Sequence, residues 1–154
     1  MKLAIIIEGV QNSGKTSTIL HFVNQYQIRT LTVMRAGWQN LYLNHLFQTL
    51  KVNPYIISSS PSESNNPLPT RFSGWTTLPD LLIMAEQAGG RHQSSTITFL
   101  TTNGYSIVTF PISNVTGSLD WERFDSSNQV TKLTNRANEI MNSIKSFIKT
   151  HSII

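Results

Sequence analysis

The hydrophobic positions of this 154-residue chain fall into short blocks that polar segments separate. The continuous apolar runs 3–7 and 81–85 have the length of strands buried on both faces, and 28–35, 54–58 and 105–111 are rich in β-branched residues. Continuous apolar strands are typical of parallel sheets whose two faces are both covered by helices. The pattern therefore predicts five strands.

Three segments carry apolar residues at helical spacing. The first helix follows Thr16, the second ends at Asn53-Pro54, and the third begins near Ser126, which forms a capping-box pattern with Gln129. The apolar stripes are Ile19, Phe22, Val23 and Tyr26; Leu43, Leu46, Phe47 and Leu50; and Val130, Leu133, Ala137, Ile140, Ile144, Phe147 and Ile148.

The segment 91–112 allows two interpretations. Its two β-branched runs could pair as a hairpin, or 91–102 could be a helix that ends at Asn103-Gly104 before a strand at 105–111. Two parallel strands need a crossover of about a dozen residues between them, and 91–102 supplies that length. We therefore favour the helix.

These elements predict an α/β fold: a three-layer α/β/α sandwich with a mostly parallel five-stranded sheet. A chain of 154 residues has room for one domain with a substantial core, so we expect 1–154 to form a single domain.

The sharpest chemical signal lies between the first strand and the first helix. Gly9-Val-Gln-Asn-Ser-Gly14-Lys15-Thr16 fits the phosphate-loop pattern of two glycines followed by Lys and Thr. A loop around a phosphate must point several successive backbone N–H groups inward, and side chains at Gly9 and Gly14 would obstruct this. Lys15 adds a positive charge for the outer phosphates, and the Thr16 hydroxyl suits Mg²⁺.

The predicted nucleotide-binding residues therefore run from Gly9 to Ser17, and the start of the helix directs its positive dipole end at the same phosphates. They are Gly9, Val10, Gln11, Asn12, Ser13, Gly14, Lys15, Thr16 and Ser17. The alternative is a plain strand-to-helix turn.

This segment resembles the P-loop nucleoside triphosphatase superfamily. The IEG before the loop and the GKTST at its end are similar to thymidylate kinases and deoxynucleoside kinases, over about 15 residues. The resemblance implies a P-loop type of fold with strand order 2-3-1-4-5, ATP or another nucleoside triphosphate as ligand, and Mg²⁺. It also implies that Asn114, in the loop after the last strand, contacts the base.

Two positions bear on the narrower resemblance. Arg35 stands where thymidylate kinases have a substrate-facing arginine at the end of the second strand, but Ala36 and Gly37 replace the Glu and Pro that follow it there. The tip of the 54–58 strand, where these kinases usually have an aspartate for the Mg²⁺ hydration shell, carries serines 58–60. Arg35 is thus a candidate substrate contact or an ordinary surface arginine.

Glu86 is the best substitute for the missing aspartate. It follows the apolar run 81–85, and ligands in open α/β sheets lie beyond the carboxyl ends of the strands. We expect Glu86 to face the phosphate loop and to position metal or water, with Lys15 as the other catalytic residue and Thr16 as the other metal ligand. The alternative is an exposed carboxylate at a strand end.

The polar, proline-containing segment 58–75 has little apolar content through Thr70. It is interpreted either as a loop over a site or as a disordered surface segment. In the first case Ser60 and Arg71 are candidate substrate residues, and an acceptor would lie beneath this loop.

Composition narrows the class of protein. The absence of cysteine excludes disulfides and thiolate metal sites, and the four histidines show no ligand spacing with one another. The net charge of +4 fits an anionic ligand, but the basic residues form no run, so nucleic acid is not expected. No stretch approaches the roughly 20 apolar residues that cross a bilayer, and Glu8 ends the first apolar run, so we expect a soluble, cytoplasmic protein without a membrane partner.

Three functions remain. The first is a Mg²⁺-dependent phosphotransferase, kinase-like, that acts from ATP on a small-molecule acceptor. The second is an ATP-dependent switch or regulatory ATPase that controls a protein partner, and the third is a degenerate phosphate loop with a structural role only.

Overall fold

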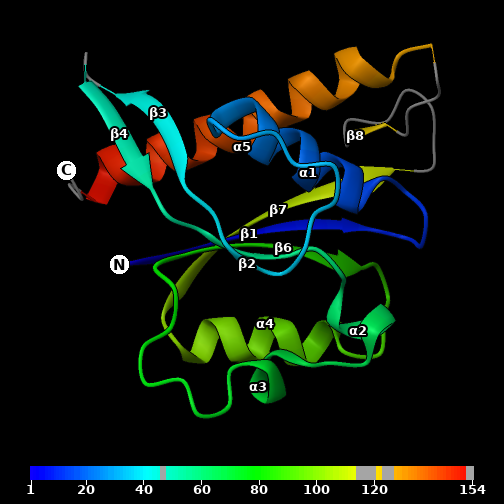
Figure 1. The fold of residues 1–154 in the computed structure, drawn as a ribbon. Helices are drawn as coiled ribbons and strands as arrows, with labels where there is room; N and C mark the ends of the chain where they lie inside the picture. The colour runs from blue at the N-terminus through cyan, green and yellow to red at the C-terminus, as the bar shows by residue number, and fades with distance from the viewer. Residues whose placement is uncertain (46–47, 114–120, 123–126, 152–154) are drawn as a thin grey trace.

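A computed structural model describes residues 1–45, 48–113, 121–122 and 127–151. Its main sheet, which is seen edge-on in Figure 1 with helices above and below it, has the order β2-β5-β6-β1-β7-β8. Five of these strands are parallel, and the two-residue β2 pairs antiparallel with β5 at one edge. The bounds are β1 Lys2–Gly9, β2 Gly37–Trp38, β5 Tyr55–Ile57, β6 Leu81–Gln87, β7 Tyr105–Ser113 and β8 Trp121–Glu122. The fold is thus mixed α/β with a mostly parallel sheet, as the sequence predicted.

The segments that occupy the positions of the predicted strand order differ from those we expected. The predicted segments placed 54–58 beside the first strand, but β6 lies there instead, with β7 on the other side of β1. Numbered as they occur along the chain, the parallel strands β1, β5, β6, β7 and β8 nevertheless stand in the order 2-3-1-4-5. The carboxyl ends of β1 and β6 are therefore neighbours.

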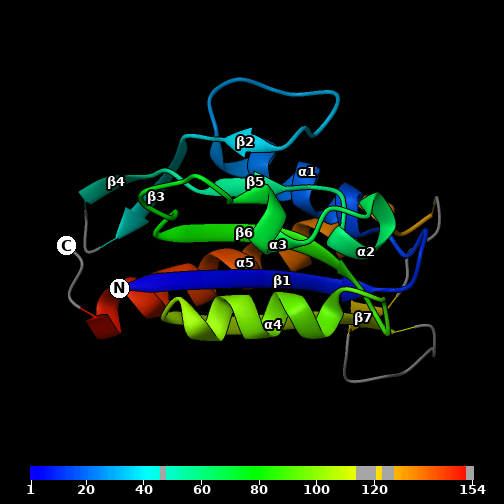
Figure 2. The same ribbon diagram turned by 90° about the horizontal axis from the view of Figure 1, so that it is seen from below.

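Helices pack on both faces of this sheet. Helices α1 (Lys15–Tyr26) and α5 (Gln129–His151) cover one face, while α3 (Leu68–Arg71) and α4 (Gln93–Thr102) cover the other, as Figure 2 shows for α4. Alternate residues of β1 point to the two faces: Ile5 and Ile7 join the cluster under α1 and α5, and Ala4 and Ile6 join the cluster under α3 and α4. The two helices predicted around α1 and α5 are confirmed.

The predicted strand at 28–35 is wrong. This segment consists of turns and bends, in which Ile28 is 86% exposed and Val33 62% exposed. The side chain of Asn24 accepts a hydrogen bond from the Leu31 N–H and donates one to the Leu31 carbonyl. Both edges of β1 are occupied by β6 and β7, so strand propensity here has no partner that would bury it.

The predicted helix over 43–50 is also wrong. The chain forms a separate antiparallel hairpin there, β3 (Leu41–His45) and β4 (Gln48–Val52), in which Leu41 is opposite Val52 and Leu43 is opposite Leu50. Apolar residues at 41, 43, 50 and 52 also fit the period of two residues expected of strands, and the helical count overlooked this period. Leu46 and Phe47, which belonged to the predicted stripe, lie outside the described residues.

The ambiguity at 91–112 is decided in favour of the helix. Helix α4 connects β6 to β7, and these two parallel strands lie on either side of β1. The hairpin alternative is therefore wrong. No helix among the described residues combines the length and the apolar character that a membrane span needs.

The segment 58–75 is more ordered than its composition predicted. It contains two short helices, α2 (Pro61–Ser64) and α3, and its residues Leu68 and Phe72 are buried in the core. The Phe72 ring packs edge-on against Trp75 at 4.8 Å between centroids. The interpretation as a disordered surface segment is therefore wrong, because a few apolar anchors are enough to fasten it to the sheet.

Candidate functional site

The predicted phosphate loop connects the end of β1 to the start of α1. The Ser13 N–H donates to the Val10 carbonyl (3.2 Å), which turns the chain back on itself. Asn12 (φ 61°) and Gly14 (φ 96°) have left-handed backbone conformations, and α1 begins directly after Gly14. No side chain caps the amino end of α1, so its first N–H groups face the loop without a protein side chain as acceptor.

The loop is tightly folded around Ser13. A Cβ atom placed on Gly9 would lie 2.3 Å from the Ser13 Oγ, so any larger residue here would force the Ser13 side chain to move. Ser13 is 3% exposed, and its hydroxyl has no hydrogen-bond partner within the described part of the chain. A buried polar atom without a partner is rare and costly in native proteins, so this hydroxyl is a candidate ligand contact.

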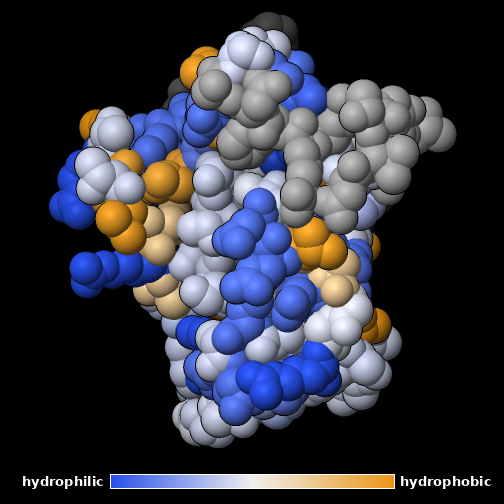
Figure 3. Space-filling view, turned by 90° about the vertical axis from the view of Figure 1, so that its right-hand side faces the viewer, coloured by the Kyte–Doolittle hydropathy of each residue, from blue (hydrophilic) through white to orange (hydrophobic). Residues whose placement is uncertain are grey.

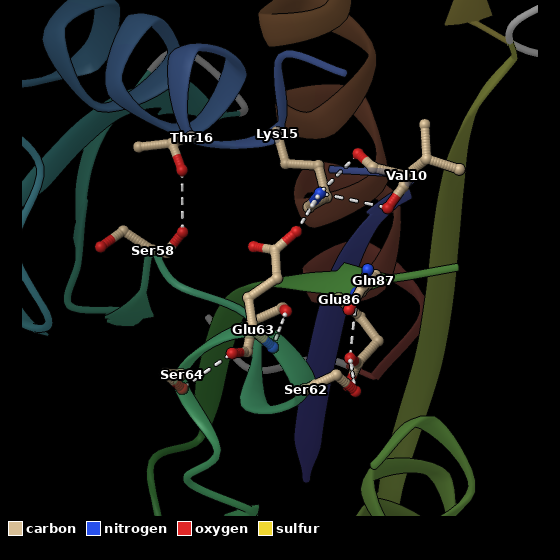
Figure 4. Close-up of polar contacts among 11 residues, drawn as sticks. Val10, Lys15, Thr16, Ser58, Ser62, Glu63, Ser64, Glu86 and Gln87 are labelled. Carbon is tan, nitrogen blue, oxygen red and sulfur yellow. Dashed lines mark hydrogen bonds and ion pairs between the residues drawn. The ribbon is translucent and has the colours of Figure 1, made fainter. Parts of the chain in front are cut away.

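Lys15 is the charged residue of the loop, and only 5% of its side chain is exposed. Its Nζ donates to the carbonyl oxygens of Gly9 (3.1 Å) and Val10 (2.8 Å) and to Oε1 of Glu63 (3.0 Å), as Figure 4 shows. The ammonium group is thus folded back over its own loop and paired with a carboxylate.

Glu63 belongs to α2, which follows β5 at the same end of the sheet (Figure 1). The Ser60 hydroxyl caps this helix by accepting from the Glu63 N–H (3.0 Å), and Pro61 occupies the first helical position. Our sequence analysis did not single out Glu63. The signal was present, because Ser60 and Glu63 form a Ser-x-x-Glu capping pattern directly after a strand.

Thr16 lies beside the tip of β5. Its hydroxyl donates to the Ser58 carbonyl (3.0 Å), and the Ser58 hydroxyl in turn donates to the Met34 carbonyl (3.1 Å). Arg35 follows Met34 and is exposed, so the structure brings the predicted substrate arginine close to this strand tip. The predicted metal ligand Thr16 and the serine tip are therefore neighbours.

These residues surround a cavity of about 540 Å³. It is lined by Glu63 and by the loop residues from Gln11 to Ser17. The face of the molecule at this end of the sheet is largely hydrophilic (Figure 3). A polar cavity lined by backbone N–H groups and one lysine suits a charged ligand.

Glu86, the predicted metal carboxylate, ends β6 beside β1 as expected, but it is not exposed. It is 1% exposed, and its oxygens accept from the Thr96 hydroxyl (2.6 Å), the Gln87 N–H (2.9 Å) and the Ser62 hydroxyl (3.3 Å). The alternative of an exposed strand-end carboxylate is therefore wrong. That Glu86 positions a metal or a water molecule stays a prediction.

The turn after β6 is tied to α2. The backbone N–H of His92 donates to the Ser62 hydroxyl (2.9 Å), and Arg91 Nε donates to the Ser62 carbonyl (3.3 Å). A ring nitrogen of His92 lies 2.9 Å from the Asn65 side-chain oxygen. The two segments therefore form one unit beside the loop.

Three other predicted site residues, Ser60, Arg71 and Asn114, do not line the cavity in the described structure. Ser60 is fully buried as the cap of α2, and Arg71 ends α3 with its Nε buried and without a hydrogen-bond partner among the described residues. Asn114, the predicted base contact, lies outside the described residues.

Arg136 of α5 supports the loop from behind and was missed by the sequence analysis. It is buried, donates to the Thr18 hydroxyl (2.8 Å), and lies over the Trp121 ring. Thr18 donates to the Gly14 carbonyl (2.7 Å), so Arg136 is connected to the start of α1. Burial lowers the pKa of Arg136 to about 10, although the negative charge of Glu139 acts in the opposite direction. At neutral pH the guanidinium group therefore still carries its charge.

No group of three or more His, Cys, Asp or Glu side chains that could hold a metal occurs among the described residues. A cation here would depend on oxygen ligands such as the Thr16 hydroxyl and on the ligand itself. No protein-family model matches the chain, and no curated protein has a significantly similar sequence.

Proposed function

We propose that this chain binds a nucleoside triphosphate with Mg²⁺ at residues 9–17 and transfers its terminal phosphoryl group to a small acceptor. The observation that supports this most is the combination at one cavity of the Lys15 ammonium, the uncapped start of α1 and the buried, unpartnered Ser13 hydroxyl. All three supply hydrogen-bond donors, and a polyphosphate supplies only acceptors and negative charge.

The residues present fit such a ligand. The N–H groups from Gly14 to Thr16 and the Ser13 hydroxyl would hold the phosphates. Lys15 would neutralise the charge that develops on the transferred group, and Thr16 would be the hydroxyl ligand of the metal. When bound, Mg²⁺ supplies charge neutralisation at the outer phosphates. The Thr16 hydroxyl would bind the cation through an oxygen lone pair, so its hydrogen could still be donated to the Ser58 carbonyl.

The proposal includes the finer fold class, a three-layer α/β/α sandwich of the P-loop type, and ATP as the nucleotide, with Asn114 as the base contact. The parallel strand order 2-3-1-4-5 supports the fold class. Arg35, which follows Met34 beside the tip of β5, supports an acceptor site at that tip, and Ser60 caps the helix that begins there. Arg71, at the end of α3, stays a predicted substrate residue.

A second function, an ATP-dependent switch, is favoured by one observation. Lys15 of the loop is paired with Glu63 of α2, so a ligand that contacts Lys15 also acts on a separate element. Hydrolysis of ATP without any acceptor would distinguish this function from the transferase.

Calorimetry with Mg·ATP tests the shared claim of nucleotide binding. We expect the Lys15→Ala variant to lose about ten- to a hundredfold in affinity, because one charge-assisted hydrogen bond to a phosphate is removed. Lys149→Ala, an exposed lysine of α5, is the matched control and should bind like the wild-type protein. Absence of binding by the wild-type protein to both Mg·ATP and Mg·GTP would overturn the proposal.

Labelled γ-phosphate then separates the two reactions. Incubation with a panel of nucleosides, sugars and short acids should give one labelled product if the protein is a phosphotransferase. Release of inorganic phosphate in every reaction, with no labelled acceptor, would overturn the transferase and leave the switch.

A further inference from the structure

Glu63 is the acidic side chain of the cavity, and it reaches Lys15 from an element 48 residues further along the chain. The Lys15 side chain is 5% exposed and the Glu63 side chain 27% exposed. Figure 4 shows the Glu63 carboxylate directed at the Lys15 nitrogen from below the loop. A carboxylate therefore occupies the position at which Lys15 would meet a phosphate oxygen.

A lysine ammonium group has three hydrogens to donate, and Lys15 has three acceptors. Two are the carbonyl oxygens of Gly9 and Val10, which belong to the strand end and the tightly folded loop. The third is Glu63, on a helix of only four residues. An incoming phosphate oxygen can most easily replace the third, because the first two are fixed by the backbone.

The exchange is also electrostatically exclusive. A phosphate oxygen and the Glu63 carboxylate carry like charges, so both cannot remain against the same ammonium group without strong repulsion in a partly buried site. The phosphate oxygen and the Glu63 carboxylate could lie side by side only with a cation between them.

We propose that Glu63 is the protein's own occupant of the anion position, so that a nucleoside triphosphate binds in competition with it and releases α2. Glu63 thus lowers the affinity of the site for the nucleotide and determines which element responds to binding. This inference rests on the proposed function, because it concerns the same Lys15.

Hydrogen bonds connect α2 to the end of β6 and to the turn after it, so release of Glu63 would affect both. Ser62, its neighbour in α2, contacts the Glu86 carboxylate and accepts from both Arg91 and His92. Movement of α2 therefore changes the hydrogen bonds of the β6 end and of the turn after it. Both segments border the carboxyl ends of the central strands, where an acceptor or a partner would approach.

The opposing possibility is that Glu63 binds the metal or the ligand directly. It predicts the opposite sign, because removal of a metal ligand weakens Mg·nucleotide binding, whereas removal of a competitor strengthens it. The sign of one affinity change therefore decides between them.

Calorimetric titration with Mg·ATP is the test. We expect Glu63→Gln, which keeps the shape of the side chain and removes its charge, to bind about two- to tenfold more tightly than the wild-type protein, as expected for loss of a partly exposed ion pair. Glu63→Ala should act in the same direction. Glu8→Gln is the matched control. It also removes one negative charge beside the loop, but Glu8 accepts a hydrogen bond from Gln93 and not from Lys15, so the affinity should stay unchanged.

Hydrogen exchange gives a second readout. The N–H groups of Glu63, Ser64 and Asn66 donate within α2, to Ser60 Oγ, Ser60 O and Pro61 O. Their exchange should accelerate when Mg·ATP binds to the wild-type protein, and should already be fast in Glu63→Gln.

The outcomes separate this inference from the proposed function. If wild-type protein binds Mg·ATP through Lys15 and Glu63→Gln binds equally or more weakly, the competition is overturned and nucleotide binding stands. If the wild-type protein binds neither Mg·ATP nor Mg·GTP, the proposed function is overturned and the inference with it.

Discussion

Ser13 is placed where folding alone does not favour it. Its hydroxyl is buried without a partner among the described residues, and the neighbouring Asn12 has a left-handed backbone. Each of these features costs of order 1 kcal/mol or more. The loop therefore carries a local cost that a ligand with hydrogen-bond acceptors would offset.

We predict that Ser13→Ala leaves the free energy of unfolding unchanged or raises it by about 1 kcal/mol, because it removes a desolvated polar group without leaving a partner unsatisfied. The same variant should bind Mg·ATP more weakly. Urea unfolding and calorimetry measure the two effects, with Ser94→Ala, at an exposed position of α4, as control. A loss of stability in Ser13→Ala would show that the hydroxyl has a structural partner.

At the level of elements, the pair of α1 and α5 forms the support behind the phosphate loop. Arg136 of α5 bonds to Thr18 of α1, and His21 of α1 has a ring nitrogen 3.1 Å from the Thr134 hydroxyl. Both contacts lie within two turns of the loop, so the position of α5 controls the orientation of the start of α1.

The His21 contact makes this helix pair sensitive to acid. Burial lowers the pKa of His21 below its ordinary value of 6.5. The unfolded chain therefore binds more protons than the folded protein as the pH falls through 6.5, and the stability present above this pH decreases below it. We expect the free energy of unfolding to decline more steeply between pH 7 and 5 in the wild-type protein than in His21→Gln. Equal slopes for the two proteins would contradict this assignment.

At the level of the whole molecule, β1 is shared by the two hydrophobic clusters. Ile5 points into the cluster beneath α1 and α5, and Ile6 points into the cluster beneath α3 and α4. The two halves of the core therefore have the central strand in common, and we expect them to unfold together.

Ile5→Ala and Ile6→Ala test this coupling. Each should lower the free energy of unfolding by about 2–5 kcal/mol, because each leaves a cavity in a fully packed core. Urea unfolding followed by tryptophan fluorescence and by circular dichroism should give one coincident transition for both variants. Ile28→Ala, at an exposed position, should stay within about 0.5 kcal/mol of the wild-type protein. Separate transitions would show that the two faces are independent units.

Prediction from the sequence succeeded where the signal was local. The strand β1, the loop and α1 were predicted together, because the apolar run, the two glycines and the helical stripe all lie within 25 consecutive residues. Helix α5 was predicted for the same reason, whereas α4 was favoured because parallel strands need a crossover between them. The 43–50 segment failed because its apolar residues fit both a period of 3.6 and a period of two, and only the pairing of β3 with β4 decides between them.

The sequence by itself determined the phosphate-loop motif with its side chains, the strand and helix on either side of it, and the long helix at the carboxyl end. Only the tertiary structure decided that β6 separates β5 from β1, that Glu86 is enclosed by Ser62 and Thr96, and that Glu63 meets Lys15. The physical reason is that strand neighbours are chosen by contacts between distant segments, whose closure entropy and packing leave no trace in any short stretch of sequence.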